Sequence, residues 1–215
     1  MSKKASNPRP LIIALLGLTL LVMVLGGAVL VVKLRPDSTA PSTQERSIST
    51  WEDAAADDPT SDVAQTGLGM ALLDVGRIQD AETAFRTALE LNEGNWMANF
   101  QLALMLRQEN PDRTLVLLDK AAANATPENR AVVLLATGDF LMARGETNAA
   151  VGAYRNSIAN ASFIFDSHLG LAKALEELGK TGAALAEYRE AGRFAPGHPE
   201  VEAAIQRLED DTGDH

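Results

Sequence analysis

The sequence of 215 residues contains no cysteine and only three histidines. The absence of cysteine excludes disulfide bonds, thiolate chemistry and a cysteine-ligated zinc site. His168, His198 and His215 form neither an HExxH motif nor another paired metal-ligand spacing, and the chain has no GxxxxGK[ST] or GxSxG motif. With no candidate residues for catalysis, a metal or a cofactor, we expect a protein that is not an enzyme and has no small-molecule substrate.

Basic residues are scarce in most of the chain. Residues 1–35 carry five basic residues and no acidic residue, so the formal charge of −10 for the whole chain corresponds to −15 for residues 36–215. Such an acidic domain repels nucleic acid and anionic lipid headgroups and favours basic or apolar protein partners. An acidic surface that serves only solubility explains the charge equally well. We expect no nucleic-acid ligand.

Internal repeats are the strongest pattern in the sequence. Segments that begin at Gly76 ("GRIQDAETAFRTALELN"), Gly145 ("GETNAAVGAYRNSIA") and Gly179 ("GKTGAALAEYREAGRFA") place a small, an aromatic and a second small residue at fixed offsets. The period is 34 residues, and an apolar segment precedes each glycine, so each unit predicts two helices. A weaker copy begins near Trp96, where Asn110-Pro111 replaces the glycine and Leu118 replaces the aromatic residue.

These units resemble the tetratricopeptide repeat (TPR), in which helix A carries large, small and large residues and helix B carries small, aromatic and small ones. The resemblance implies an all-α, right-handed superhelical solenoid of about four helix pairs. An ordinary helical bundle with accidental periodicity is the alternative. Apolar residues at helical spacing further predict a capping helix, followed by an acidic tail. The predicted repeats cover 62–95, 96–128, 131–164 and 165–198 within 62–198, the capping helix 199–209 and the tail 210–215.

A long apolar run lies near the N-terminus. Residues 11–32 carry no charge over 22 positions, which is enough to span a bilayer as a helix. Lys33-Leu34-Arg35-Pro36 follows where a signal peptide would have a small-residue cleavage site, so an uncleaved transmembrane helix is predicted over 11–33. The positive-inside rule favours a cytoplasmic N-terminus and an extracytoplasmic repeat domain. A domain that faces the cytosol is the alternative.

Two short segments flank this run. Residues 1–10 form a basic N-terminal segment, and residues 34–49 are rich in Pro, Ser and Thr, which predicts a flexible linker. Residues 50–61 predict a short helical turn with Ser49 or Thr50 as its N-cap. That turn would lay Trp51 against the first repeat.

The TPR resemblance also implies a binding mode. Proteins of this family bind protein segments in a concave groove that is lined mainly by the A helices. The corresponding positions here are mostly apolar in the first three repeats and include several methionines, which predicts a pliable groove for a partner peptide or protein segment. The predicted groove residues are Val63, Met70, Leu73, Met97, Phe100, Gln101, Leu104, Arg107, Leu135, Asp139, Met142 and Lys173.

An N-terminal anchor followed by TPRs resembles the layout of TPR subunits of bacterial cytochrome c maturation haem lyases and of periplasmic chaperone-associated TPR proteins. The resemblance implies a scaffold, adaptor or assembly factor for an extracytoplasmic or membrane complex. A constitutive structural subunit with a permanently filled groove and a cytosol-facing receptor are the alternatives. The protein's own segment around Trp51 is a further candidate occupant of the groove, and a role of these apolar side chains as core between repeats is the other alternative.

Overall fold

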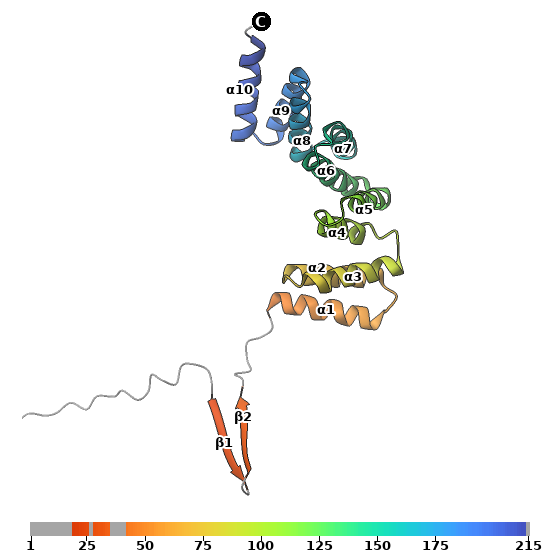
Figure 1. Cartoon of the computed structure of the whole chain (residues 1–215), viewed down its shortest axis with the longest axis vertical. Coiled ribbons are helices and arrows are strands. Elements are labelled where there is room, and N and C mark those ends of the chain that lie inside the picture. The colour runs from red at the N-terminus through yellow and green to blue at the C-terminus, as the bar shows by residue number, and fades with distance from the viewer. Residues whose placement is uncertain (1–18, 26–27, 35–41, 214–215) are drawn as a thin grey trace, which may run out of the picture. The chain divides into compact units, whose positions relative to one another are not determined.

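The computed structural model describes residues 19–25, 28–34 and 42–213, and the chain divides into two units, Met1–Arg46 and Ser47–His215. The first unit contains strands β1 (Thr19–Leu25) and β2 (Ala28–Leu34). The two strands pair antiparallel, with Thr19 opposite Leu34 and Leu25 opposite Ala28 (Figure 1).

These strands differ from the predicted transmembrane helix. Residues 19–25 and 28–34 have extended backbone, and within the described ranges no helix combines the length and apolar character needed to cross a bilayer. A continuous apolar run carries no periodicity that separates helix from strand, and this one is rich in valine, whose β-branched side chain favours extended backbone. Residues 1–18 and 26–27 lie outside the described residues.

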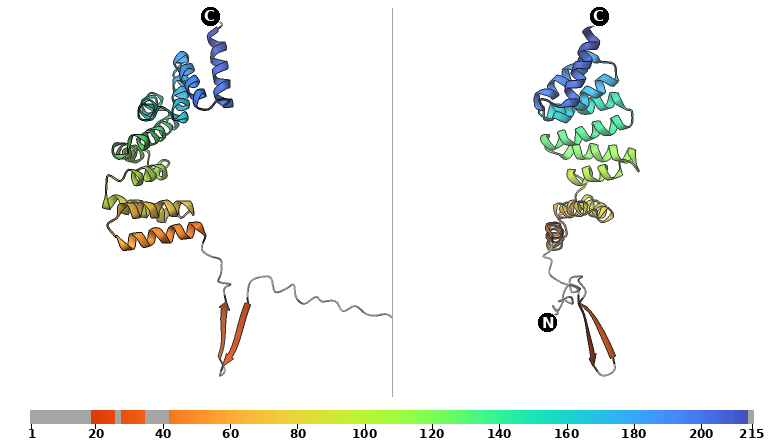
Figure 2. Two further views of the ribbon diagram at one scale, coloured as in Figure 1. Left: turned by 180° about the vertical axis from the view of Figure 1, so that it is seen from behind. Right: turned by 90° about the vertical axis from the view of Figure 1, so that its left-hand side faces the viewer.

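The second unit consists of helices that stack in chain order (Figures 1 and 2). Helix α1 precedes four helix pairs, and one further helix follows them. Residues 62–198 contain eight helices, with breaks at Gly76, Asn110, Gly145 and Gly179 among others, which confirms the prediction of four pairs. The helices are α1 (Thr43–Asp57), α2 (Asp62–Asp74), α3 (Ile78–Leu91), α4 (Trp96–Leu106), α5 (Pro111–Asn124), α6 (Pro127–Ala143), α7 (Thr147–Asn160), α8 (Phe165–Glu177), α9 (Thr181–Phe194) and α10 (Pro199–Gly213).

Helix α1 is longer than the predicted helical turn and takes in residues 43–49 of the predicted linker. Its N-terminus is a capping box between Ser42 and Glu45. The Ser42 Oγ accepts a hydrogen bond from the Glu45 backbone N–H at 3.1 Å, and the Ser42 backbone N–H donates to the Glu45 carboxylate at 2.7 Å. Because this reciprocal pair satisfies two unpaired helix-end donors, the N-cap is Ser42 and not Ser49 or Thr50.

Aromatic rings on the B helices join successive repeats. Tyr154 on α7 is buried and lies between Gly138 of its own pair and Gly170 of the next. A Cβ atom at either glycine would lie 2.5 Å from the tyrosine ring, so the ring fits only because both positions lack a side chain. Phe85 on α3 lies against Gly69 of its own pair in the same way.

Trp51 on α1 continues this series toward the N-terminus. It stands 34 residues before Phe85, and it lies against Gly67, where a Cβ atom would overlap the indole ring. Trp51 and Gly67 are 16 residues apart, as are Tyr154 and Gly170. Helix α1 therefore acts as the B helix of an incomplete repeat, and its tryptophan is half-buried where Tyr154 is buried.

The buried apolar residues form two clusters that divide within α6. Val133 belongs to the first cluster and Leu141 to the second. Helix α10 completes the second cluster through Val201 and Leu208, which confirms the predicted capping helix. This helix continues to Gly213, so residues 210–213 of the predicted tail are helical, while residues 214–215 lie outside the described part.

Candidate partner-binding groove

Three cavities follow the A helices in chain order. An N-terminal cavity of about 440 Å³ is lined from α1, α2 and α4, and a central cavity of about 550 Å³ from α4, α5 and α6. A C-terminal cavity of about 400 Å³ is lined from α6, α7 and α8. Asp139 lines both the central and the C-terminal cavity, so these two adjoin. The three cavities together are called the groove below.

Most of the predicted groove residues line one of these cavities. Leu73, Phe100 and Gln101 line none of the three. The remaining predicted residues are divided among the three cavities according to the repeat to which they belong, because the A helices follow one another along the groove. Val63, Met70 and Met97 line the N-terminal cavity, Leu104, Arg107 and Asp139 the central cavity, and Leu135, Asp139, Met142 and Lys173 the C-terminal cavity.

Several predicted residues also belong to the packing between repeats. Met70, Leu73 and Phe100 are partly buried and pack against the first core cluster. Gln101 donates a hydrogen bond to the Met97 Sδ at 3.8 Å. A polar substitution at Phe100 would therefore disturb core packing as well as the groove, so exposed groove residues make cleaner probes.

Val63 and Val132 are exposed apolar residues. They are 63% and 46% exposed, on the A helices α2 and α6; Val63 lines the N-terminal cavity, and Val132 lines none of the three cavities. Val116 on α5 is 54% exposed on a B helix and lines none of the three cavities. The chain thus offers a matched set of exposed valines, two on A helices and one on a B helix.

The Trp51 ring forms part of the N-terminal cavity. It lines this cavity together with Val63, Met70 and Met97. The protein's own segment before the first repeat therefore covers one end of the groove, while the central and C-terminal cavities are lined only by residues from α4 onward. The sequence analysis placed Trp51 against the first repeat and named its segment as a candidate occupant of the groove, and the structure places the ring in the wall of the N-terminal cavity.

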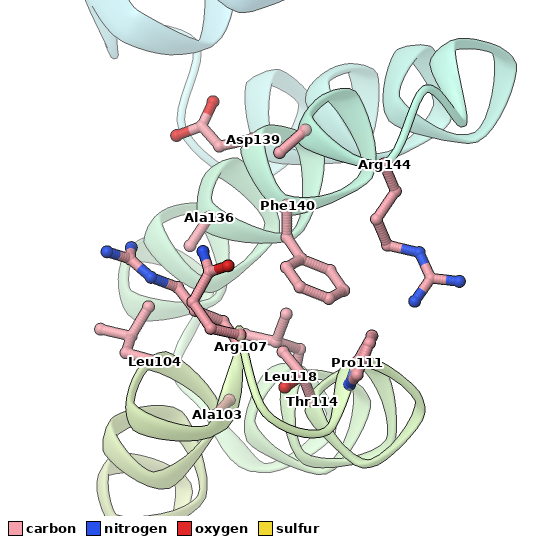
Figure 3. A pocket seen from close by; sticks show the side chains of 12 residues that line it. Ala103, Leu104, Arg107, Pro111, Thr114, Leu118, Ala136, Asp139, Phe140 and Arg144 are labelled. Atoms are coloured by element: carbon pink, nitrogen blue, oxygen red, sulfur yellow. The ribbon is translucent and has the colours of Figure 1, made fainter.

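The central cavity combines an apolar interior with charged residues around it (Figure 3). Phe140 points from α6 toward α4 and α5, above Leu118 and Thr114 on α5. The Arg144 guanidinium lies 5.7 Å from the Phe140 ring centroid and pairs with Glu146 at 2.6 Å. Arg107 lies on the α4 side of the cavity.

The central cavity arises where the second repeat departs from the pattern of the others. Leu118 occupies the position of Phe85, Tyr154 and Tyr188, so no ring from α5 enters the space next to α6. Helix α4 has 11 residues, whereas α2 and α8 have 13 and α6 has 17. The shorter helix and the missing ring leave a gap that Pro111, Thr114 and Phe140 line without filling. The missing aromatic residue was the sequence signal for this site.

Tyrosine hydroxyls engage two carboxylates of repeats 3 and 4. The Tyr154 hydroxyl donates to Asp139 at 2.7 Å, and burial together with this bond raises the pKa of Tyr154 well above its usual value. The Tyr188 hydroxyl donates to Glu176 at 2.9 Å, and burial again raises the pKa of the tyrosine. Both phenols therefore stay protonated and act as fixed donors.

Two charged residues of α8, at the C-terminal end of the repeat domain, form ion pairs with α10. Arg207 pairs with Glu176 at 2.7 Å and lowers the pKa of that carboxyl, while Lys173 pairs with Glu200 at 2.6 Å. The charged residues expected at this end of the groove are therefore engaged within the domain. Within the described ranges, no three His, Asp or Glu side chains are grouped so as to hold a metal ion.

Comparisons with known proteins agree with this architecture. A tetratricopeptide repeat family model matches residues 66–129 and 135–199. No curated protein matches the sequence. Three solved structures that share the fold are described next, and each is less than 25% identical to this chain.

The crystal structure of YrrB, described as a TPR protein with an unusual peptide-binding site, has a TM-score of 0.67 and 13% identity, covering 78% of this chain and 86% of that one. PilW, described as a widely conserved type IV pilus biogenesis factor, has a TM-score of 0.65 and 18% identity, and the match covers 80% of this chain and 79% of PilW. PilF of Pseudomonas aeruginosa has a TM-score of 0.61 and 20% identity, and the match covers 74% of this chain and 72% of PilF.

Proposed function

Since the chain belongs to the tetratricopeptide repeat family, we propose that it binds an extended or helical segment of a partner protein in the groove. In this role it is a non-enzymatic scaffold, adaptor or assembly factor. The partner's apolar side chains enter the cavities along the A helices, and its remaining surface stays in water. A peptide-binding site named for the structural neighbour YrrB is in keeping with this proposal.

One observation carries the proposal, namely the row of three cavities along the A helices. Methionine and leucine side chains from all four repeats line them, and methionine adapts its shape to different apolar partners. Val63 is an exposed apolar residue of the N-terminal cavity, and Val132 is a second exposed apolar residue on an A helix. Apolar surface that a folded domain leaves exposed is typical of interaction sites.

The proposal is tested with a random peptide display library selected on the full chain in detergent. We expect Val63→Asp and Val132→Asp each to weaken the selected peptides at least tenfold, because each places a charge on the apolar path of the segment. Val116→Asp makes the same chemical change on a B helix, and we expect it to leave affinity unchanged. Equal weakening by all three variants, or by Val116→Asp alone, would overturn the proposal.

A specific observation favours a second arrangement, in which the protein covers part of its own groove. Trp51 already forms a wall of the N-terminal cavity. If α1 competes with a partner there, Trp51→Ala raises peptide affinity. If Trp51 instead completes the site, the same substitution lowers affinity, and isothermal titration calorimetry distinguishes the two outcomes.

We further propose that the apolar run attaches the domain to a membrane, with the repeats on the extracytoplasmic side. The support is the sequence alone, namely the 22 uncharged residues of 11–32 and the basic residues before them. Protease added to intact spheroplasts should digest the repeat domain. Protection until lysis would place the domain in the cytosol, and recovery in the soluble fraction would remove the attachment.

A further inference from the structure

The second and third repeats meet differently from the third and fourth. Between the third and fourth repeats the Tyr154 ring lies between Gly138 and Gly170, two small positions on successive A helices. The corresponding positions between the second and third repeats hold Ala103 and Ala136, and both line the central cavity. The ring that would lie there is absent because α5 carries Leu118.

The volume of this space is large for a packing defect. Protein interiors have few voids larger than a water molecule, whereas sites for small ligands measure roughly 300–1,000 Å³. The central cavity, at about 550 Å³, falls within the second range. Leu104, Arg107 and Asp139 line this cavity and are also groove residues predicted from the sequence.

The lining is suited to an aromatic ring. Phe140 offers a ring face or edge for an offset or edge-to-face contact, and Leu104, Leu118 and Ala136 supply apolar walls. Arg107 and Arg144 place guanidinium groups around the same space, and Arg144 already lies near the Phe140 ring. An aliphatic side chain would leave much of the volume empty and would gain neither contact.

We propose that the central cavity takes one aromatic side chain of the bound partner segment, in the place that the protein's own Tyr154 fills one repeat later. This inference rests on the proposed peptide-binding function and adds the identity of its anchor residue. The second repeat lacks an aromatic side chain of its own at this position, and the partner segment supplies one. The cavity is therefore the position that sets sequence preference along the groove.

The test uses N-acetyl-tryptophan amide as the aromatic probe and N-acetyl-alanine amide as its control, each titrated into the methyl-labelled full chain in detergent. We expect the tryptophan amide to shift the Leu118 and Ala136 methyl signals and to saturate them, while the alanine amide leaves them in place. A probe that shifts neither methyl group, or an alanine amide that shifts them equally, would overturn the inference.

Variants at the cavity make the test specific. Leu118→Tyr fills the cavity from α5, and we expect it to weaken the tryptophan amide at least tenfold. Leu118→Met keeps a similar side-chain volume and should retain binding within twofold. Ala136→Leu fills the cavity from the partly exposed face of α6, so it gives the same readout if Leu118→Tyr fails to fold. Wild-type affinity in both filling variants would also overturn the inference.

The converse variant checks the structural equivalence of the two junctions. Tyr154→Leu removes the ring between Gly138 and Gly170, and we expect the folded variant to bind the tryptophan amide at a second site that shifts the Leu169 methyl signals. Binding that stays confined to the central cavity in this variant would contradict the equivalence on which the inference depends.

The outcomes separate this inference from the proposed function. If Val63→Asp and Val132→Asp weaken the displayed peptides while Leu118→Tyr changes neither peptide nor probe binding, the groove stands and the aromatic anchor is wrong. If Leu118→Tyr removes the probe while the valine variants leave peptide binding unchanged, the cavity binds rings but the groove is not the peptide site.

Discussion

The two inter-repeat junctions around α6 and α8 are built from the same positions and have different consequences. At the junction of the third and fourth repeats, Tyr154 is 2% exposed and fills the space between two glycines. At the junction of the second and third repeats, Leu118 leaves a cavity of about 550 Å³. Tyr154 also lines the C-terminal cavity of about 400 Å³, so the position that carries a ring borders the smaller of these two cavities and the position that lacks one borders the larger.

The same contrast appears in the core. The two clusters of buried apolar residues divide within α6, next to the central cavity. On the filled side, Tyr154 connects α6, α7 and α8 in one cluster and fixes Asp139 through its hydroxyl. On the open side, Phe140 is only partly buried against the first cluster. Van der Waals contacts that are missing around the central cavity can be made by a partner side chain that fills it.

The largest expected effect follows from emptying the filled junction. Tyr154→Ala should lower the free energy of unfolding by about 3–5 kcal/mol, because a buried ring is lost and two glycines face the gap. Leu118→Ala should cost less, since its neighbours already border a cavity. Urea denaturation followed by circular dichroism measures both, and a greater loss for Leu118→Ala would contradict the comparison.

Adding a side chain to each junction sharpens the contrast. Gly170→Leu should destabilise the domain by about 1–3 kcal/mol, because the new side chain meets the Tyr154 ring. Ala136→Leu occupies the corresponding position on α6, and the open cavity should hold its cost within about 0.5 kcal/mol. Thermal denaturation of the two variants side by side checks this, and equal losses would show that the junctions are packed alike.

Phenylalanine at the two ring positions should act in opposite directions. Leu118→Phe fills part of the cavity and should raise the free energy of unfolding by about 0.5–2 kcal/mol. Tyr154→Phe keeps the ring but removes the hydrogen bond to Asp139, which should cost about 0.5–1.5 kcal/mol. Destabilisation by both substitutions would mean that the central cavity has no room for a ring.

The smallest effect concerns pH at the C-terminal end. Arg207 lowers the pKa of Glu176 in the folded state, so this carboxylate stabilises the domain above its unfolded pKa and loses that contribution as pH falls through the folded value. The Glu176 side chain is 30% exposed and solvent screens part of the interaction, so we expect less than about 1 kcal/mol. Melting temperatures between pH 7 and pH 3 should fall less for Glu176→Gln than for wild type. Glu128→Gln serves as the control, and a steeper fall for Glu176→Gln would reverse the sign.

The sequence predicts the repeat domain well because its signals are local and recur. A turn glycine with φ near 70° ends the first helix of three pairs, as at Gly76 and Gly145. The small–aromatic–small pattern fixes the contacts of the B helices α3, α7 and α9. Sequence reasoning missed the start of α1, because the Ser42–Glu45 capping box lies in a segment whose composition is typical of a linker.

Other features depend on neighbours that are distant in sequence. The missing ring at Leu118 was evident, but its consequence required knowing that Phe140 and Ala136 border the same space. The core role of Phe100 likewise follows from packing across repeats. The apolar run adopts strands at residues 19–25 and 28–34. Membrane attachment, orientation and the resemblance to haem lyase subunits stay predictions.

Site-specific photocrosslinking in living cells tests the central claim most directly. A diazirine-bearing lysine analogue replaces Arg107 at the central cavity or Arg155, which is exposed on α7 and lines none of the three cavities. We predict that position 107 crosslinks to one partner segment that contains an aromatic residue, as mapped by mass spectrometry, and that Leu118→Tyr abolishes this crosslink. Crosslinks that arise equally from position 155, or that persist in the Leu118→Tyr variant, would contradict a partner anchored in the central cavity.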